Sequence, residues 1–124
     1  MNLIRNDAAR VFSLKHGKCG GLFRTRKLAA IAEAAGLTCF VNSMIEMDIS
    51  VAASLHLAAT IPNLVDHGHA LMSNLRIKAG VLADGAFQYD GTDILIPEQC
   101  SGLGVKLDEK KLEGRIVDRF VLEI

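Results

Sequence analysis

Lys15 is the residue whose type and position most clearly suggest chemistry. It ends the run of residues 11–15, whose apolar content and length are typical of a strand. Strand side chains alternate between two faces, so Phe12 and Leu14 share the face that suits packing under helices. Ser13 shares the opposite face with Lys15. A lysine at the carboxyl end of a barrel strand, partly desolvated and near a bound cation, can act as a general base near neutral pH. The alternative is a strand-end lysine whose ammonium group reaches solvent.

The other residues with possible chemistry give weaker indications. The segment Asp66-His67-Gly68-His69 contains three potential metal ligands, but ligands this close in sequence rarely converge on one ion, so we expect no metal site there. His56 lies on the apolar stripe of an expected helix, where a hydrogen-bonded core histidine is the expectation. Cysteines are odd in number and far apart, which favours reduced, half-buried thiols; they are Cys19, Cys39 and Cys100.

The elements that must position Lys15 alternate between strands and helices. Residues 22–35 show helical periodicity and end at Gly36, and residues 37–42 form the next expected strand. A second helix is expected over residues 45–60, followed by a short strand over residues 63–66. This order with short connections predicts βαβ units, with three parallel strands side by side in sequence order.

From about residue 71 the pattern changes. Residues 86–89 and 92–96 read as a β-hairpin with Asp90-Gly91 in its turn. One helical turn capped by Asp108 is expected over residues 108–112, and a last strand over residues 119–124. The sequence therefore predicts two parts: βα units over residues 1–70, and a β-hairpin and tail over residues 71–124.

Composition excludes several classes of protein. The chain has 124 residues, of which 50% are apolar, enough for a core. Its 14 basic and 14 acidic residues balance, which argues against a nucleic-acid groove. No apolar run reaches the roughly 18 residues of a membrane span, and the first residues lack a signal-peptide pattern, so we expect a cytoplasmic protein that contacts no membrane.

Several motifs together resemble a known family. Residues 12–22 (Phe-Ser-Leu-Lys-x-x-Lys-x-Gly-Gly-Leu) and the helix after them look like the sixth strand and helix of the mandelate racemase/muconate lactonizing enzyme family, in the enolase superfamily. Residues 42–46 and 52–59 resemble its seventh strand and helix, and residues 102–108 its C-terminal stretch. The resemblance implies the last three βα strands of a (β/α)8-type barrel, followed by a small β-rich tail that would join a capping domain.

The resemblance also implies roles for individual residues. The first lysine of the Lys-x-x-Lys-x-Gly-Gly segment is the family's acid/base group beside the substrate's α-carbon, and that position is Lys15. Glu46 has an alternative role as a carboxylate in the first turn of a helix. The positions assigned to binding a small carboxylate-containing substrate are Lys18, Ser43, Met44, Glu46, Asp66 and His67.

The family's chemistry implies a metal ion whose ligands we do not find in this sequence. Abstraction of a proton α to a carboxylate gives an enediolate, whose charge a divalent cation, Mg²⁺, neutralises. In the family the three carboxylate ligands come from the third, fourth and fifth strands, and the sequence begins just before the sixth. We therefore expect part of a metal-dependent lyase or isomerase that is inactive by itself.

Other readings remain open from the sequence. One is a split enzyme completed by a partner chain. Another is a truncated, non-catalytic interaction module that self-associates through sheet edges. A third, an independent domain of the response-regulator type, lacks the expected acidic cluster and fifth strand. Within the enzyme reading, the histidines at residues 67 and 69 favour a hydroxy-acid dehydratase over a dipeptide epimerase.

Overall fold

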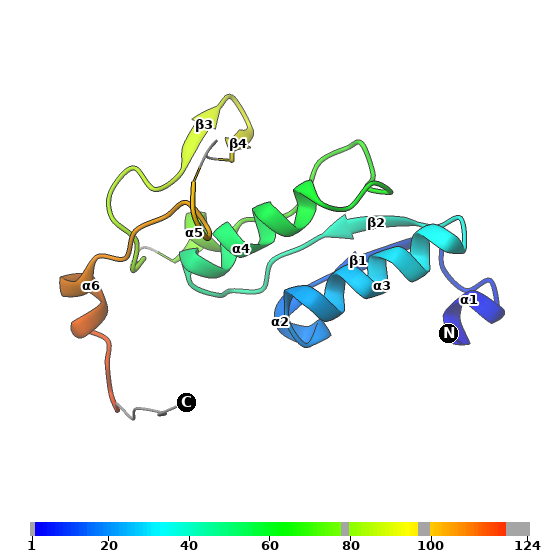
Figure 1. Cartoon of the computed structure of the whole chain (residues 1–124), viewed down its shortest axis with the longest axis horizontal. Coiled ribbons are helices and arrows are strands. Elements are labelled where there is room, and N and C mark those ends of the chain that lie inside the picture. The colour runs from blue at the N-terminus through cyan, green and yellow to red at the C-terminus, as the bar shows by residue number, and fades with distance from the viewer. Residues whose placement is uncertain (1, 78–79, 97–99, 119–124) are drawn as a thin grey trace.

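The computed structural model describes residues 2–77, 80–96 and 100–118 and has a mixed α/β architecture (Figure 1). Short helices α1 and α6 lie at opposite ends of the molecule. The helices are α1 (Asn2–Arg5), α2 (His16–Cys19), α3 (Leu22–Ala34), α4 (Asp48–Ala59), α5 (Ser73–Arg76) and α6 (Glu109–Glu113). The strands are β1 (Val11–Leu14), β2 (Thr38–Val41), β3 (Gln88–Asp90) and β4 (Asp93–Leu95).

Strands β1 and β2 are parallel, as the sequence predicts, with Val11 opposite Thr38 and Leu14 opposite Val41. The third expected strand, residues 63–66, is present only as an isolated parallel bridge between Leu64 and Cys39. A second parallel bridge joins Asn42 to Ala70. The order of the three segments is therefore as predicted, but the prediction of a full strand over residues 63–66 is wrong.

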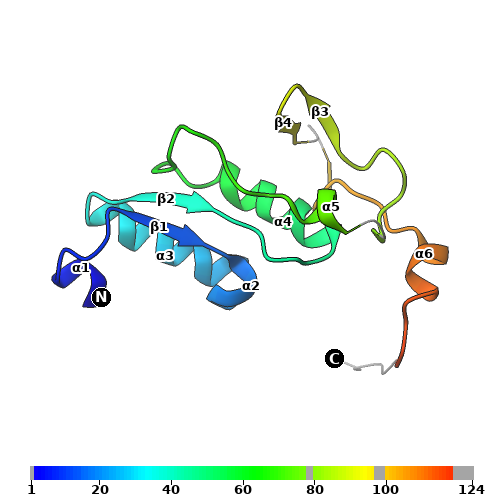
Figure 2. The same cartoon turned by 180° about the vertical axis from the view of Figure 1, so that it is seen from behind.

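The two faces of this sheet differ as strand alternation predicts. On the side that α3 covers, Leu14, Cys39 and Val41 are buried, and Phe12 packs against the same cluster. On the other side Val11, Ser13 and Thr38 are exposed. Figure 2 shows this second side of β1 and β2 with α3 behind the strands. The sheet thus has one face packed under helices and one face open.

Helix α3 matches its expected range. Its buried face is made of small side chains, Thr25, Ala29 and Ala32, which allow the helix to approach the sheet closely. At its start the Thr25 hydroxyl donates to the Gly21 carbonyl oxygen at 2.7 Å. Past its end Gly36 has a φ of 70°, the left-handed conformation that terminates helices and that glycine adopts without strain.

Helix α4 begins at Asp48, three residues later than the sequence predicts. The preceding segment is held in an irregular conformation by α5, because the Ser73 hydroxyl hydrogen-bonds to the Met44 carbonyl oxygen. Glu46 therefore does not lie in the first helical turn, and that expectation is wrong. The first-turn carboxylate is Asp48, which also accepts from the Val81 and Leu82 N–H groups at 3.0–3.1 Å.

The part after residue 71 contains the expected hairpin with a different turn. Asp90 pairs with Asp93, so the two-residue loop is Gly91-Thr92 and not Asp90-Gly91. Gly91 has a φ of 60°, which suits the first position of such a loop. The turn over α6 is confirmed, and the Asp108 carboxylate accepts from the Lys111 N–H at 3.1 Å. The strand expected over residues 119–124 lies outside the described residues.

None of the helices within residues 2–77, 80–96 and 100–118 has both the length and the apolar character needed to cross a membrane.

Candidate functional site

A cavity of about 260 Å³ lies where β1 and β2 end at their carboxyl termini. In parallel α/β sheets this is the end at which ligands bind. The cavity combines two cationic side chains with hydroxyl, amide and apolar groups. Its lining residues are Lys15, Asn42, Ser43, Met44, Ile45, Met72, Ser73 and Arg76. Three of the residues predicted from the sequence, Lys15, Ser43 and Met44, thus meet at one site.

Lys15 continues the alternation of β1. Its backbone is extended, with φ −125° and ψ 106°, so it follows Ser13 on the open face of the sheet. The side chain is half-buried and lines the cavity. Within the described part of the chain, no hydrogen bond or ion pair engages its ammonium group. Beside it, the Asn42 amide donates to the Ser13 hydroxyl at 3.4 Å, so the neighbouring polar groups face the same side.

Ser43 connects the loop after β2 to the segment before α5. Its hydroxyl donates to the Ala70 carbonyl oxygen at 2.9 Å and accepts from the Met72 N–H at 3.1 Å. The Ser43 N–H also donates to the Ala70 oxygen, at 2.9 Å. Ser43 therefore shapes the cavity wall with a hydroxyl that is already engaged in hydrogen bonds.

Glu46 lies beside the cavity but does not line it. Its carboxylate oxygen Oε2 is 3.0 Å from the hydroxyl oxygen of Ser73. Ser73 is buried and hydrogen-bonds as well to the carbonyl oxygen of Met44. Through these contacts the first turn of α5 is fixed against the loop that follows β2.

The other predicted site residues lie elsewhere. Lys18 is exposed on α2, and Asp66 is exposed in the bend after the bridge at Leu64. His67 stacks on Phe40 with ring centroids 6.3 Å apart and lines a different cavity, of about 880 Å³, next to the β3–β4 hairpin. The substrate-binding roles of these three residues stay predictions.

His69 is placed against the end of β2. The Val41 N–H donates to its Nδ1 at 3.4 Å, and the ring centroid lies 5.9 Å from that of Phe40. Burial, followed by the nearby charge of His67, lowers the pKa of His69 from its ordinary value of 6.5. The neutral imidazole is thus the form that this environment favours.

His16 and His56 lie within hydrogen-bonding distance of backbone carbonyl oxygens, and the cysteines differ in burial. His16 Nε2 is 3.2 Å from the Ser50 carbonyl oxygen on α4, and His56 Nε2 is 3.0 Å from that of Leu103. His56 is half-buried and hydrogen-bonded, as expected. Cys39 is buried, and its burial raises the pKa of its thiol. Cys100 is exposed, so the expectation of half-burial is wrong there.

The described residues do not fit a resident divalent cation. No group of three or more His, Cys, Asp or Glu side chains comes together in residues 2–77, 80–96 and 100–118 in a way that could hold one. The cavity that contains Lys15 has no carboxylate or imidazole in its lining. Hard cations such as Mg²⁺ require oxygen ligands, mainly carboxylates.

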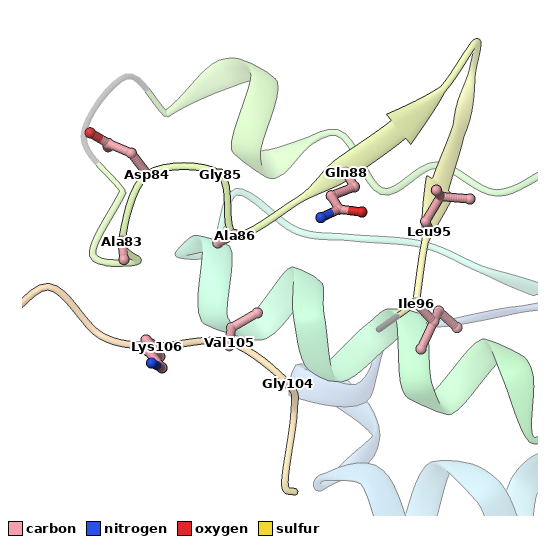
Figure 3. Close-up of a pocket in the computed structure, with 10 residues that line it drawn as sticks. All are labelled: Ala83, Asp84, Gly85, Ala86, Gln88, Leu95, Ile96, Gly104, Val105 and Lys106. Carbon is pink, nitrogen blue, oxygen red and sulfur yellow. The ribbon is translucent and has the colours of Figure 1, made fainter. Parts of the chain in front are cut away.

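A larger cavity, of about 670 Å³, lies between the hairpin and the segment at residues 104–106 (Figure 3). Gln88, Leu95 and Ile96 of the hairpin part lie across from Val105 and Lys106. None of the residues predicted from the sequence to bind substrate lines it.

Sequence reasoning did not identify five of the lining residues as site residues: Asn42, Ile45, Met72, Ser73 and Arg76. Asn42 could have been found, because it lies at the end of the second expected strand, where parallel sheets carry their sites. Ser73 and Arg76 belong to α5, a four-residue helix with no periodicity to reveal it, and Met72 directly precedes that helix. Only tertiary contacts bring that helix to the end of β2.

Comparisons of sequence and of structure with known proteins point to the same family. A family model described as enolase C-terminal domain-like matches residues 1–111. Muconate cycloisomerase 1 of Rhodococcus opacus is 39% identical over 108 residues, which cover 87% of this chain and 28% of that protein. The chain thus spans less than a third of the length of this curated relative.

Solved structures agree in fold. A muconate cycloisomerase variant superposes with a TM-score of 0.82 and 34% identity, covering 91% of this chain and 31% of the other. An enolase from Gibberella zeae, complexed with magnesium, formate and sulfate, superposes with a TM-score of 0.76 and 33% identity, covering 90% of this chain and 26% of that one. The magnesium ion belongs to that neighbouring structure.

Proposed function

Because the chain belongs to the enolase C-terminal domain-like family, we propose that it supplies the acid/base lysine and one wall of the substrate pocket of a metal-dependent lyase or isomerase. The reaction is abstraction or return of a proton at the carbon α to a carboxylate. The position of Lys15, half-buried in a cavity of mixed polar and apolar lining at the carboxyl ends of parallel strands, is the observation that carries this proposal.

Lys15 is suited to this role by its surroundings. A general base must reach its substrate without competing contacts, and in the described residues no partner holds the ammonium group. Its position on the open face directs it to the side of the sheet that no described helix covers. Ser43 and Met44 form the adjoining wall, and we propose that Glu46, Lys18, Asp66 and His67 contribute at the edge of the complete pocket.

The architecture supports a barrel origin for this sheet. We propose that β1, β2 and the bridged segment at residues 63–65 are the last three parallel strands of a (β/α)8-type barrel. The exposed side chains of Val11, Ser13 and Thr38 would then face the barrel interior. The segment after residue 71, with its hairpin, would join the capping domain.

The metal belongs to the complete enzyme in this proposal. Since the described residues do not fit Mg²⁺, the carboxylate ligands would come from strands that these 124 residues do not contain. Those strands belong either to a longer polypeptide or to a separate partner chain. Among the described strands β1 pairs only with β2, so its other edge is where the next strand would pair.

The names of the relatives support a choice of reaction to test first. Curated relatives such as the Rhodococcus opacus protein are named muconate cycloisomerases. We propose cycloisomerisation of an unsaturated acid as the first reaction to test. Hydroxy-acid dehydration, which the histidines at residues 67 and 69 favour, uses the same α-proton transfer and is the second.

The test uses a chimera in which the matching 108-residue segment of the Rhodococcus opacus enzyme is replaced by that of this chain. Turnover of muconate is followed by the loss of its diene absorbance. Lys15→Ala should lower kcat about 10²- to 10⁴-fold, the usual contribution of a general acid or base.

The matched control is Lys27→Ala, because Lys27 lies over the Phe23 ring of α3 and does not line the cavity. Its kcat should stay within about twofold of the parent chimera. A chimera that turns over muconate equally well with and without the Lys15 ammonium group would refute the proposed role.

A further inference from the structure

The chain contains two Asp-Gly pairs, and neither lines the cavity around Lys15. They are Asp84-Gly85 and Asp90-Gly91. The peptide nitrogen of a glycine that follows an aspartate can attack the side-chain carboxyl carbon, because glycine has no side chain to hinder the approach. The product of this reaction after hydrolysis is isoaspartate. Which pair reacts depends on how the structure holds the carboxylate and the backbone.

The carboxylate of Asp84 is held by Lys111. Its Oδ1 lies 2.6 Å from Lys111 Nζ, and the hydrogen bond and charge of Lys111 lower the pKa of the Asp84 carboxyl. Lys111 also donates to the Leu82 carbonyl oxygen at 3.2 Å, so it ties the carboxylate to the backbone that precedes it. The ion pair therefore keeps the carboxyl ionised, which is its less reactive form, and engaged with a partner other than the glycine N–H.

The backbone before Asp84 is anchored as well. The Ala83 N–H donates to the Lys106 carbonyl oxygen at 2.9 Å. An antiparallel bridge joins Leu82 to Leu107. Cyclisation requires the peptide unit to rotate until the glycine nitrogen faces the carboxyl carbon, and these contacts oppose that rotation.

The carboxylate of Asp90 has no such partner. It is exposed at the end of β3, and within the described part of the chain no hydrogen bond or ion pair engages it. The residue opposite it in the hairpin is Asp93, which carries a charge of the same sign. The Gly91 N–H donates to none of the described backbone carbonyl groups, so the attacking nitrogen is free of a competing hydrogen bond there.

The hairpin that carries Asp90 is short and exposed. Strands β3 and β4 pair over three residues each, and all three residues of β3 are exposed. No other described strand pairs with them. A two-stranded hairpin by itself is marginally stable in water, so local opening gives the backbone the freedom that cyclisation requires.

We propose that Asp90-Gly91 is a site of spontaneous isoaspartate formation, and that the Lys111 ion pair protects Asp84-Gly85 from the same reaction. The Gly91 nitrogen forms a bond to Asp90 Cγ, and the hydroxyl of the protonated carboxyl group leaves as water with the amide proton, which gives a succinimide. Water then adds to the ring at the former main-chain carbonyl and breaks its bond to nitrogen. One water is released and one consumed, so no co-reactant is needed.

The product changes the hairpin. The main chain now runs through Cβ and Cγ of Asp90, which adds one backbone carbon atom and leaves the former main-chain carboxylate as a side group. The Asp90–Asp93 pair closes the two-residue loop, so this extra atom disturbs the pairing. Gln88 and Leu95 of the same hairpin line the cavity in Figure 3, whose wall the reaction therefore alters with time. This inference is independent of the role proposed for Lys15.

The test is a long incubation of the folded 124-residue chain at neutral pH, followed by peptide mass spectrometry with electron-transfer fragmentation, which distinguishes isoaspartate from aspartate. Isoaspartate should form at Asp90 about threefold or more faster than at Asp84, since an exposed ion pair and local anchoring each slow the reaction by a small factor. The chain unfolded in guanidinium chloride is the reference, and there the two pairs should react at similar rates.

Two variants separate the causes. Lys111→Gln should raise the rate at Asp84 about two- to fivefold, the factor that an exposed ion pair contributes, and leave the rate at Asp90 unchanged. Lys110→Gln is the matched control, because Lys110 is an exposed lysine of the same helix that forms no ion pair with Asp84. It should change neither rate. Circular dichroism shows that each variant keeps the parent fold.

A rate at Asp84 equal to or above that at Asp90 in the folded chain would overturn the assignment of the site. So would the absence of isoaspartate at Asp90 in the folded chain after the unfolded chain has reacted. An Asp84 rate in Lys111→Gln equal to that of the parent would overturn the protective role of Lys111.

Discussion

The ammonium group of Lys15 takes its position from backbone geometry. The residue follows β1 in an extended conformation, so alternation along the strand decides which face it occupies. Leu14, the residue before it, is 3% exposed in the core, and Lys15 is directed to the opposite side. Because side chains alternate between the two faces of a strand, the sequence of β1 alone was enough to predict the direction of the Lys15 side chain.

His69 provides a prediction about pH. Its pKa is below 6.5 in the folded chain because of burial and the charge of His67, so the unfolded chain binds the proton more readily. The contribution of neutral His69 to the free energy of unfolding should be fully present above about pH 6.5. It should be lost as the pH falls towards the pKa of the folded chain. Protonation also removes Nδ1 as the acceptor of the Val41 N–H. Melting temperatures between pH 7.5 and 5.5 measure this effect.

The variant for this experiment is His69→Asn, whose amide oxygen can replace Nδ1 as the acceptor but does not titrate in this range. Its melting temperature should depend less on pH than that of the parent chain. The same pH dependence in both proteins would contradict the assignment to His69.

At the scale of elements, Asp48 joins α4 to the segment that follows α5. Its carboxylate accepts from the Val81 and Leu82 N–H groups and is 9% exposed. Gly80 lies so close that a Cβ there would overlap the Asp48 carboxylate. The start of α4, which lies just after the loop lining the Lys15 cavity, is therefore coupled to the C-terminal part of the chain.

Asp48→Asn should lower the free energy of unfolding by about 1–3 kcal/mol, because an amide nitrogen would face backbone donors. Denaturant titration measures this loss. Asp7→Asn, at an exposed aspartate paired with Arg10, is the matched control and should change stability by less than about 1 kcal/mol.

A double-mutant cycle between Gly80 and Asp48 can test the overlap at Gly80. Gly80→Ala should destabilise the parent chain and should cost less in the Asp48→Ala background, where the carboxylate is absent. Additive losses in the double variant would show that the carboxylate does not limit the space at Gly80.

Local sequence patterns predicted the helices and strands whose formation depends mainly on neighbouring residues. The helix over α3, both parallel strands and the Asp108 cap follow from periodicity and capping residues. The start of α4 and the position of α5 depend on contacts of Ser73 with Met44 and Glu46, which lie 29 and 27 residues before it in the sequence. The pocket-lining role of Arg76 was missed for the same reason.

At the scale of the whole molecule, the described residues leave one face of the β1–β2 sheet open and one edge of β1 without a partner strand. Val11, at the start of β1, is 45% exposed although it is apolar. Such edges promote association with other strands, either of a second copy or of a complementing chain. We propose that this surface is the one by which the complete enzyme is assembled.

Association should therefore depend on the β1 edge. Sedimentation of the isolated chain should reveal larger species as concentration rises, and Val11→Lys should reduce them because a charged side chain disfavours strand addition. Val117→Lys is the matched control, since Val117 is fully exposed outside the sheet. Equal association of all three proteins would exclude β1 as the contact.

The most direct measurement of the central claim is proton transfer by Lys15. The chimera turns over muconate in deuterium oxide, and mass spectrometry measures solvent deuterium at the carbon next to the carboxylate of the product. We predict incorporation in the parent chimera, a loss of about 10²-fold or more in its rate for Lys15→Ala, and little change for Lys27→Ala, because Lys27 lies over the Phe23 ring outside the cavity. Deuterium incorporation at the parent rate in the Lys15→Ala chimera would contradict the account.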